Sequence, residues 1–407
     1  MTRRSVAIAL LAPLVVAGCN ALDHSTQVEQ SKKHWSHVRA RVKLQLAQRS
    51  FQNAALDDAL KACAEVVGLA PDMPEAHQLM SRIHLERGEV AKAQASLTLA
   101  ESLAPDDPET SYLHGLIAER RGKLDEAIEF YHEAYQARSD ELDYLVTYVE
   151  CLIAADRCAE AMAVIQPRRA DFERHASVHA LAGQALSLLG RKIEAAGCYQ
   201  LAVHLAPEDP VLREEAGLAL LAVDRIEQAH ALFDTGPTES NSAISPSLAA
   251  LLADGLLRKS RRPDQAARLL EHAVTTHQND PTLWLLLAEA CMQTDRIDRA
   301  GEAIDQAARL APDRAELWLL KAYHALATGR TIDAVRAARR LVQRDPDDVE
   351  ARALLAKTLE IDPQTVPEAA THYQHILSIA PDNAWAARRL DQLNQRLQTA
   401  RAAATDQ

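Results

Sequence analysis

Residues 108–141 read PETSYLHGLIAERRGKLDEAIEFYHEAYQARSDE and contain two amphipathic helical patterns. The first pattern consists of Tyr112, Leu113, Leu116 and Ile117. The second consists of Ala127, Ile128, Phe130, Tyr131 and Ala134. Apolar residues three and four positions apart share one face of a helix. Gly122 lies between the patterns, where a chain reversal needs a helix stop. The stretch therefore predicts a helix–turn–helix unit.

Alanine marks the recurrence of this unit along the chain. An interval of 34 residues separates Ala59, Ala93, Ala127, Ala161, Ala195 and Ala229. After a short insertion the pattern resumes with Ala266, Ala300, Ala334 and Ala369. A fixed period of this length indicates a repeat array, in which each unit contacts only its neighbours. Such a chain has no single catalytic core, so its function is expected on the surface that the stacked units create.

The fixed positions of the unit have steric reasons. Gly115 and Ala127 are small because the two helices are expected to cross there, and Tyr131 is large because it fills the space between one unit and the next. The Asp107-Pro108 pair restarts the helix, since aspartate caps exposed amides and proline suits the first helical position. The same pair recurs at 209–210 and 280–281.

These residues resemble the tetratricopeptide repeat, which has a small residue, an alanine, an aromatic residue, a second alanine and a proline at fixed positions. The unit from Pro108 supplies Gly115, Ala127, Tyr131 and Ala134, with Ser139 in place of the proline. The unit from Ala176 supplies all five as Gly183, Ala195, Tyr199, Ala202 and Pro207. The eighth and ninth units, which start at Pro281 and Ala315, add the first-helix tryptophan of the family as Trp284 and Trp318. The resemblance implies an all-α, right-handed superhelical solenoid of about ten repeats, closed by a C-terminal capping helix.

The repeat phase divides the chain into segments. Unit starts are expected at Ala40, Pro74, Pro108, Leu142, Ala176, Pro210, Ser247, Pro281, Ala315 and Val349. Six units then occupy 40–243 and four occupy 247–383, followed by a capping helix and tail in 384–407. Pro167 is expected to shorten or kink the second helix of the fourth unit. The Ser-, Thr-, Pro- and Gly-rich stretch 234–247 predicts that the sixth unit loses its second helix to a loop, which is either a hinge or a surface insertion.

Residues 1–18 have the features of an export signal, with two arginines before an apolar stretch, 6–17, that is too short to span a bilayer. The VAGC sequence at residues 16–19 resembles the lipobox of bacterial lipoproteins. The resemblance implies cleavage before Cys19, acylation of that residue, and an outer-membrane location through Asn20. Residues 19–39 would then be the lipidated cysteine, a tether and a lead-in helix. The alternatives are an ordinary signal peptide and twin-arginine export.

Candidate catalytic and metal sites are few. Among the remaining cysteines, Cys151 and Cys158 are close enough for a disulfide, although their apolar surroundings favour buried thiols. Two histidine pairs have helical spacing, His175 with His179 and His372 with His375. No HExxH motif or carboxylate cluster completes a metal site, so these histidines are interpreted as solvated. We predict that the chain is not an enzyme and has no cofactor, metal or small-molecule substrate. Its net charge of −12 disfavours nucleic acid as a partner.

The first helices of the resembled family line a concave groove, which implies candidate binding residues here. These are Tyr112, Leu116, Leu285, Glu289, Met292, Glu316, Leu319, Tyr323 and Leu326. In the eighth and ninth units they form, with Thr282 and Gln293, an apolar strip edged with carboxylates, which suits an apolar helix or extended peptide. The alternative is that packing or self-association buries part of the strip. Some members of the family bind the C-terminal carboxylate of a peptide through asparagine and lysine of their first helices. The expected first helices of this chain contain no asparagine, which disfavours such a clamp.

These observations predict a membrane-anchored periplasmic scaffold or assembly factor with protein partners in the cell envelope. Lipoproteins of similar build serve pilus or secretion systems, polysaccharide export and outer-membrane assembly, which is an analogy of class only. One alternative is a regulatory or adaptor subunit of an envelope enzyme complex. Another is an enzyme with an unrecognised site, for which Glu289 and Glu316 are the candidate acids.

Overall fold

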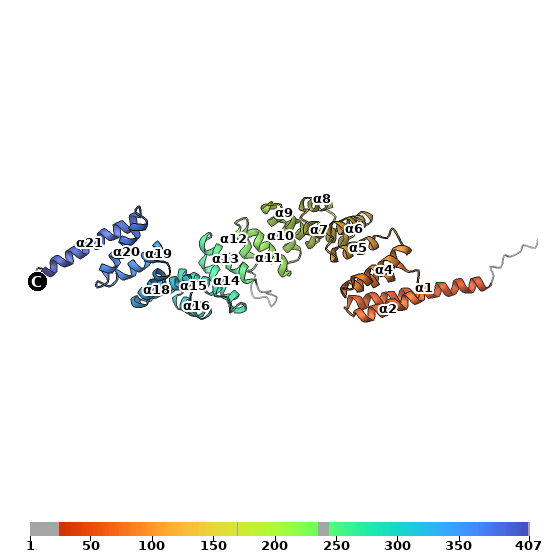
Figure 1. Ribbon diagram of the computed structural model, residues 1–407, viewed down its shortest axis with the longest axis horizontal. Coiled ribbons are helices and arrows are strands. Elements are labelled where there is room, and N and C mark those ends of the chain that lie inside the picture. Colours follow the sequence, from red (N-terminus) through yellow and green to blue (C-terminus); the bar gives the residue numbers. More distant parts are fainter. Residues whose placement is uncertain (1–23, 169, 235–243, 406–407) are drawn as a thin grey trace, which may run out of the picture. The chain divides into compact units, whose positions relative to one another are not determined.

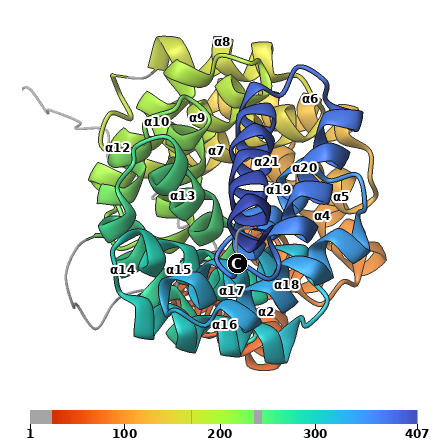
Figure 2. The same cartoon turned by 90° about the vertical axis from the view of Figure 1, so that its left-hand side faces the viewer.

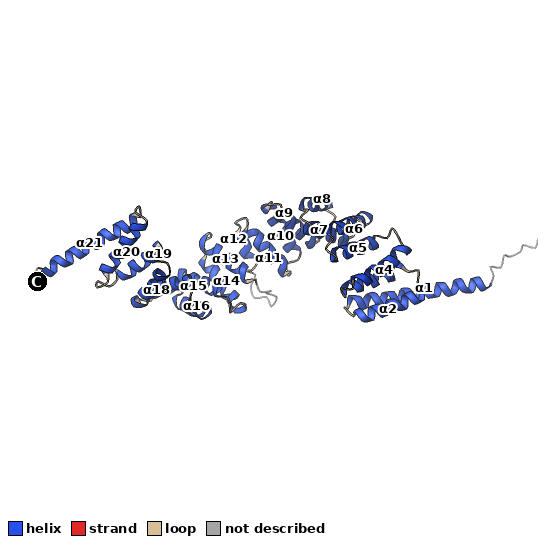
Figure 3. Cartoon of the chain, viewed as in Figure 1, coloured by secondary structure: helices blue, strands red, loops and turns tan. Residues whose placement is uncertain are grey.

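The computed structural model describes residues 24–168, 170–234 and 244–405, and within these ranges every regular element is an α-helix and none is a strand (Figure 3). The export signal with Cys19 and most of the 234–247 loop lie outside the described residues. No helix in the described part is both long and apolar enough to cross a bilayer.

The chain divides into two compact units, residues 1–172 and 173–407 (Figure 1). The helices of the first unit are α1 (His24–Gln52), α2 (Leu56–Leu69), α3 (Pro74–Glu86), α4 (Val90–Leu103), α5 (Pro108–Arg120), α6 (Leu124–Ala137), α7 (Leu142–Ala154) and α8 (Cys158–Arg168). The helices of the second unit are α9 (Ala176–Leu188), α10 (Lys192–Leu205), α11 (Pro210–Leu221), α12 (Ile226–Ala231), α13 (Pro246–Arg258), α14 (Pro263–Thr276), α15 (Pro281–Gln293), α16 (Ile297–Leu310), α17 (Ala315–Ala327), α18 (Thr331–Arg344), α19 (Val349–Leu359), α20 (Val366–Ile379) and α21 (Ala384–Thr405).

Successive helices pack in pairs, from α1 with α2 to α19 with α20, so the expected all-α array of helix pairs is confirmed. Figure 2 shows the end of the second unit, where α20 lies beside α19 and α21. Two expected starts differ from the helix bounds. Ala40 lies inside α1, and α13 begins at Pro246 instead of Ser247 because the Ser245 hydroxyl caps it by accepting from the Leu248 amide.

The periodic alanines form the packing seam of the array. Each of the ten is at most 1% exposed, from Ala59 in α2 to Ala369 in α20. A larger side chain at these positions would overpack the helix crossing, at a cost of about 1–3 kcal/mol. The 34-residue interval therefore records one tight helix contact repeated through the chain.

In three repeats, a glycine of the first helix faces an aromatic ring that lies in the second helix or just after its end. A Cβ built on Gly115 would lie 2.4 Å from Tyr131 Cε1, and one on Gly183 would lie 2.9 Å from the Tyr199 ring. Gly217 has the same relation to the Phe233 ring, at 3.1 Å. The sequence placed Tyr131 between repeats, but the ring packs across Gly115 within its own repeat because the missing Cβ leaves room for it.

The turns inside the repeats share one backbone feature. A residue with left-handed φ ends the first helix of successive repeats: Ala54, Gly88, Gly122, Asp156, Gly190, Asp224, Arg261, Asp295 and Gly329. At Gly122 the amide donates to Glu119 O, and the next amide donates to Ala118 O, which is the Schellman pattern. The expected aspartate caps are confirmed at Asp107, Asp209 and Asp280, each of which accepts from amides of the following first turn.

Two repeats are irregular, in both cases through the second helix. Helix α8 contains Pro167 and ends one residue later, so it has 11 residues where its counterparts have 14. Helix α12 has six residues, so the sixth repeat keeps a short second helix instead of losing it. One hydrophobic core joins α11 and α12 to α13 across the loop, and the boundary between the compact units lies at 172–173, not in 234–247.

Candidate functional site

The second unit carries a cleft between α15 and α17, with a volume of about 400 Å³. We call it the α15–α17 cleft. Its lining residues are Arg258, Thr282, Leu285, Leu286, Glu289, Met292, Gln293, Arg314, Glu316, Leu319, Leu320 and Tyr323. Both helices are first helices of their repeats, and each also packs against its own second helix, α16 or α18. The cleft therefore lies on the faces of α15 and α17 that the second helices leave open.

The middle of the α15–α17 cleft is apolar. Leu285 is buried at its floor, and Met292 is half-buried. Leu319 and Tyr323, one helical turn apart on α17, are 37% and 45% exposed. Side chains of this kind gain free energy when an apolar partner removes them from water. The exposed pair is therefore the part of the cleft that can contribute most to binding.

Arginine–carboxylate pairs mark the two ends of this cleft. Two guanidinium nitrogens of Arg258 each donate to a Glu289 oxygen at 3.2 Å, and Gln293 also donates to Glu289. At the other end, Arg314 lies 3.4 Å from Glu316 and donates to the Thr282 hydroxyl at 2.9 Å. Arg258 also pairs with Asp254 at 2.5 Å, so one guanidinium is shared by two carboxylates at the Glu289 end, whereas Arg314 and Glu316 form a single pair.

The structure brings together most of the predicted groove residues of the second unit. Six lie around the cleft: Leu285, Glu289, Met292, Glu316, Leu319 and Tyr323. Leu326 is the exception, because it packs against the core formed by α18, α19 and α20. Both tryptophans of the first helices, Trp284 and Trp318, are partly buried against a hydrophobic core. Trp284 donates to Gln278 O at 2.8 Å, and the Trp318 ring lies under Lys321 and Arg340.

The predicted groove residues of the first unit have a different environment. Tyr112 is half-buried and stacks on Tyr144 at 5.1 Å between ring centroids, and Leu116 packs against the core around Leu113. The carboxylate of Glu109 pairs with Arg82 at 2.9 Å and accepts from Tyr144. Burial raises the pKa of Glu109 in spite of the nearby guanidinium. This surface is a packed polar and aromatic network, in which the candidate residues contact one another.

Sequence reasoning missed four residues of the α15–α17 cleft: Arg258, Leu286, Arg314 and Leu320. Arg258 ends α13, in the preceding repeat. Arg314 precedes α17 as its N-cap residue. Its spacing of 32 residues from Thr282 is two short of the 34-residue period, so the two residues do not occupy equivalent repeat positions and periodicity carries no signal for their contact.

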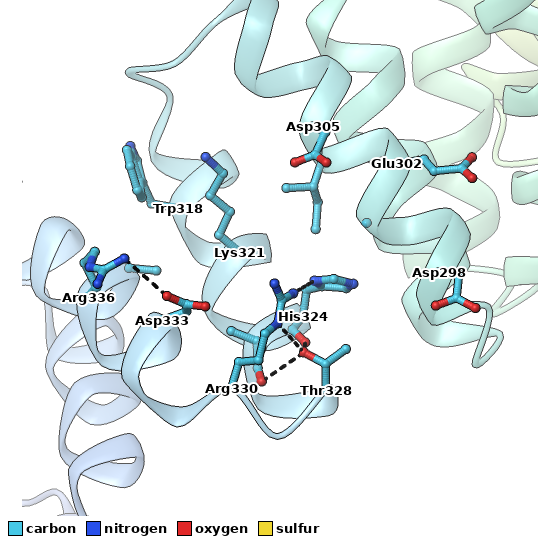
Figure 4. A pocket seen from close by; sticks show the side chains of 14 residues that line it. Asp298, Glu302, Asp305, Trp318, Lys321, His324, Thr328, Arg330, Asp333 and Arg336 are labelled. Atoms are coloured by element: carbon cyan, nitrogen blue, oxygen red, sulfur yellow. Dashed lines mark hydrogen bonds and ion pairs between the residues drawn. The ribbon is translucent and has the colours of Figure 1, made fainter.

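A second cleft, of about 680 Å³, lies between α16, α17 and α18 (Figure 4). Its lining includes Asp298, Glu302 and Asp305 from α16 and Lys321 and Arg336 from the following two helices. Asp333 of α18 also lines it and pairs with Arg336 at 3.2 Å, so the cleft is polar and its α18 side carries both signs of charge.

His324 is one of the residues that line this second cleft. Its Nε2 donates to Ile297 O at 3.1 Å. Its Nδ1 accepts from Arg330 at 3.0 Å, as drawn in Figure 4. A Cβ on Gly301 would lie 3.0 Å from His324 Nε2. Both ring nitrogens are thus occupied by the protein, and the imidazole serves to join α16 to α17.

Cysteines and histidines of the described residues form no metal site. No group of three His, Cys, Asp or Glu side chains is placed to hold an ion in this part of the chain. Cys151 and Cys158 are both free and buried, and burial raises the pKa of Cys151 to about 11. His179 is buried instead of solvated, and its Nε2 donates to Glu173 O at 2.9 Å because helix packing covers its ring.

Comparisons with known proteins agree with this helix-pair architecture. Residues 50–119, 118–185 and 257–322 match a family model described as "Tetratricopeptide repeat", and residues 315–358 match a second model with the same description. Together the matches cover more than half of the chain. No curated protein matches.

Solved structures of similar build include the "APC/C hetero-tetramer Cut9-Hcn1", at 12% identity over 91% of this chain and 98% of that one, with a TM-score of 0.38. Yeast Tom70 is 13% identical over 88% of this chain and 96% of its own, with a TM-score of 0.36. MamA from Desulfovibrio magneticus RS-1 is 20% identical over 39% and 90%, also with a TM-score of 0.36.

Proposed function

The chain belongs to the tetratricopeptide repeat family, and we propose that it is a lipid-anchored scaffold of the bacterial cell envelope that holds an apolar segment of a partner protein in the α15–α17 cleft. Family membership supports the general role, a scaffold or adaptor for protein–protein interaction. The anchor, the compartment and the binding surface are the specific parts of the proposal.

The exposed Leu319–Tyr323 pair carries the proposal of a binding surface. These two side chains form the exposed apolar middle of a cleft in which Glu289 and Glu316 are each already paired with an arginine, so the ligand that complements them is an apolar segment. Burying a side chain of this kind completely contributes about 1.5–3 kcal/mol, and these two still expose 37% and 45% of their surface. Burying the remaining surface of both therefore contributes about 1–2.5 kcal/mol, which is on the order of tenfold in affinity.

In-cell crosslinking tests the surface. A photoreactive residue in place of Tyr323 should capture a partner, and the captured protein's apolar segment should bind the purified chain. Leu319→Glu with Tyr323→Ala should weaken that binding on the order of tenfold or more while the circular dichroism stays helical. Ile193→Glu is the matched control, because Ile193 is 67% exposed on α10, outside this cleft. Equal loss in the control, or unchanged binding in the cleft variant, would refute the proposed surface.

The anchor is supported by the sequence alone, in the VAGC run that ends at Cys19. Acylation there would hold the chain at a membrane, and Asn20 favours the outer one. Cys19→Ala should leave the protein soluble in the periplasm or unprocessed when cells are fractionated. Incorporation of labelled palmitate should disappear in the same variant. Labelling that survives the substitution would place the acyl chain on another residue.

A further inference from the structure

Helix α1 carries an exposed apolar stripe that no other described residue covers. The stripe consists of Val28, Trp35, Val38, Val42 and Leu46, which are between 38% and 65% exposed. At 3.6 residues per turn these positions fall within a sector of about 80° and extend for about 27 Å along the helix. They therefore form one continuous strip.

The packing face of α1 lies on another side of the helix. Its buried residues are Ala40, Leu44 and Ala47, and all of them contribute to the core shared with α2 and α3. Every residue from Val28 to Trp35 is exposed, and this part of α1 extends beyond the end of α2 (Figure 1). A helical segment of this length is marginal in water unless something packs against it. Residues 28–35 of α1 thus have no packing partner among the described residues.

The charge of α1 is opposite to that of the whole chain. The helix contains six lysines and arginines and a single carboxylate, Glu29, whereas the chain has a net charge of −12. Lys32, Arg39 and Arg49 border the apolar stripe, and none of them makes an ion pair with a described residue. Lys43 differs, because it pairs with Glu65 of α2. The rim of the stripe is therefore both basic and unneutralised.

We propose that α1 binds in the plane of a bilayer surface rich in anionic phospholipid, with its apolar stripe among the headgroups and Lys32, Arg39 and Arg49 on the phosphates. An apolar face with tryptophan, a basic rim and a freely extending helix is the combination that binds such an interface. A second copy fits this face less well, because two α1 helices would bring the same cations together. The contact depends on α1 alone and does not require a lipid on Cys19.

Vesicle flotation tests the contact with the full chain carrying Cys19→Ala, so that no acyl anchor contributes and residues 1–23 are common to every variant. The probes are vesicles of phosphatidylcholine with 30% phosphatidylglycerol and vesicles of phosphatidylcholine alone. The parent should prefer the anionic vesicles and lose that preference in high salt. Changing Lys32, Arg39 and Arg49 to glutamine should reduce binding on the order of a hundredfold.

Trp35→Glu with Val42→Glu should reduce binding at least tenfold without loss of helicity, because both side chains are exposed in the folded chain. Ile193→Glu with Val211→Glu is the matched control, since these residues are 67% and 62% exposed in the second unit, and it should bind as the parent does. Equal binding by all variants would overturn the proposal. The proposal would also be overturned if the parent did not bind vesicles and instead formed a dimer that Trp35→Glu dissociates. Neither result bears on the Cys19 anchor, which cell fractionation tests separately.

Discussion

Gly115→Ala tests whether the ring of Tyr131 sets the spacing of the helices in the third repeat. The added Cβ would lie 2.4 Å from Tyr131 Cε1 and 2.5 Å from Cδ1. The ring has little freedom to move away, because Tyr131 is 1% exposed, packs on Tyr112 and donates to Glu119 at 2.7 Å. The substitution should therefore strain the contact between α5 and α6.

Two opposing effects decide the size of the change. Overpacking a buried contact costs about 1–3 kcal/mol, and the close approach to two ring atoms favours the upper end. Replacing glycine by alanine inside a helix returns about 1 kcal/mol of helix propensity. The net destabilisation should be about 2 kcal/mol, which corresponds to roughly thirtyfold faster exchange of the protected α5 and α6 amides.

Native-state hydrogen exchange is the appropriate assay, because a repeat array can open locally and a single unfolding midpoint would average over its repeats. Gly197→Ala is the control: this glycine lies within α10, and its Cβ would meet nothing within 4 Å. That variant should slow exchange in α10 by about fivefold through helix propensity alone. Adding Tyr131→Leu should recover part of the loss at Gly115. Slower exchange of α5 and α6 in Gly115→Ala would refute the idea that the ring is fixed in place.

Two further predictions concern titratable groups. Burial lowers the pKa of His230 below 6.5, so the folded chain binds fewer protons than the unfolded chain, and stability around α12 should be complete above pH 6.5 and fall as the pH drops below it. Exchange rates of α12 amides, corrected for the intrinsic exchange rate at each pH, should show less protection at pH 5.5 than at pH 7.5 in the parent but not in His230→Leu. Burial raises the pKa of Cys63 and of Cys151 to about 11. A thiol reagent at pH 8 should therefore label none of the five buried cysteines in the native Cys19→Ala variant and all five in urea. A disulfide between Cys151 and Cys158 would instead leave only three cysteines to be labelled in urea.

The regular part of the fold could be predicted because it depends on neighbours in the chain. The alanine interval identified every buried seam position from Ala59 to Ala369, and the Asp-Pro pairs identified three capped helix starts. Pro167 indicated the short α8 for the same reason, since proline removes a backbone donor and ends a helix locally. Local geometry is carried by residue type and spacing, which are visible in the sequence.

The candidate site could be predicted only in part. Leu285, Leu319 and Tyr323 were found because repeat positions indicate which face of a first helix is open. Arg258 and Arg314 were missed because they enter the cleft from the end of another repeat and from a turn, where periodicity carries no signal. Leu326 was placed in the cleft by its position, but the core around α19 and α20 covers it.

The sequence by itself determined the repeat, its length, its tight contacts and its caps, because each follows from interactions within about one repeat. Only the tertiary structure decided which side chains of different repeats meet. It also decided that one hydrophobic core includes residues of both α12 and α13, and that one side of α1 has no described partner. These features depend on how much surface each helix loses to its neighbours. That quantity is set by packing in three dimensions, not by the order of residues in any one repeat.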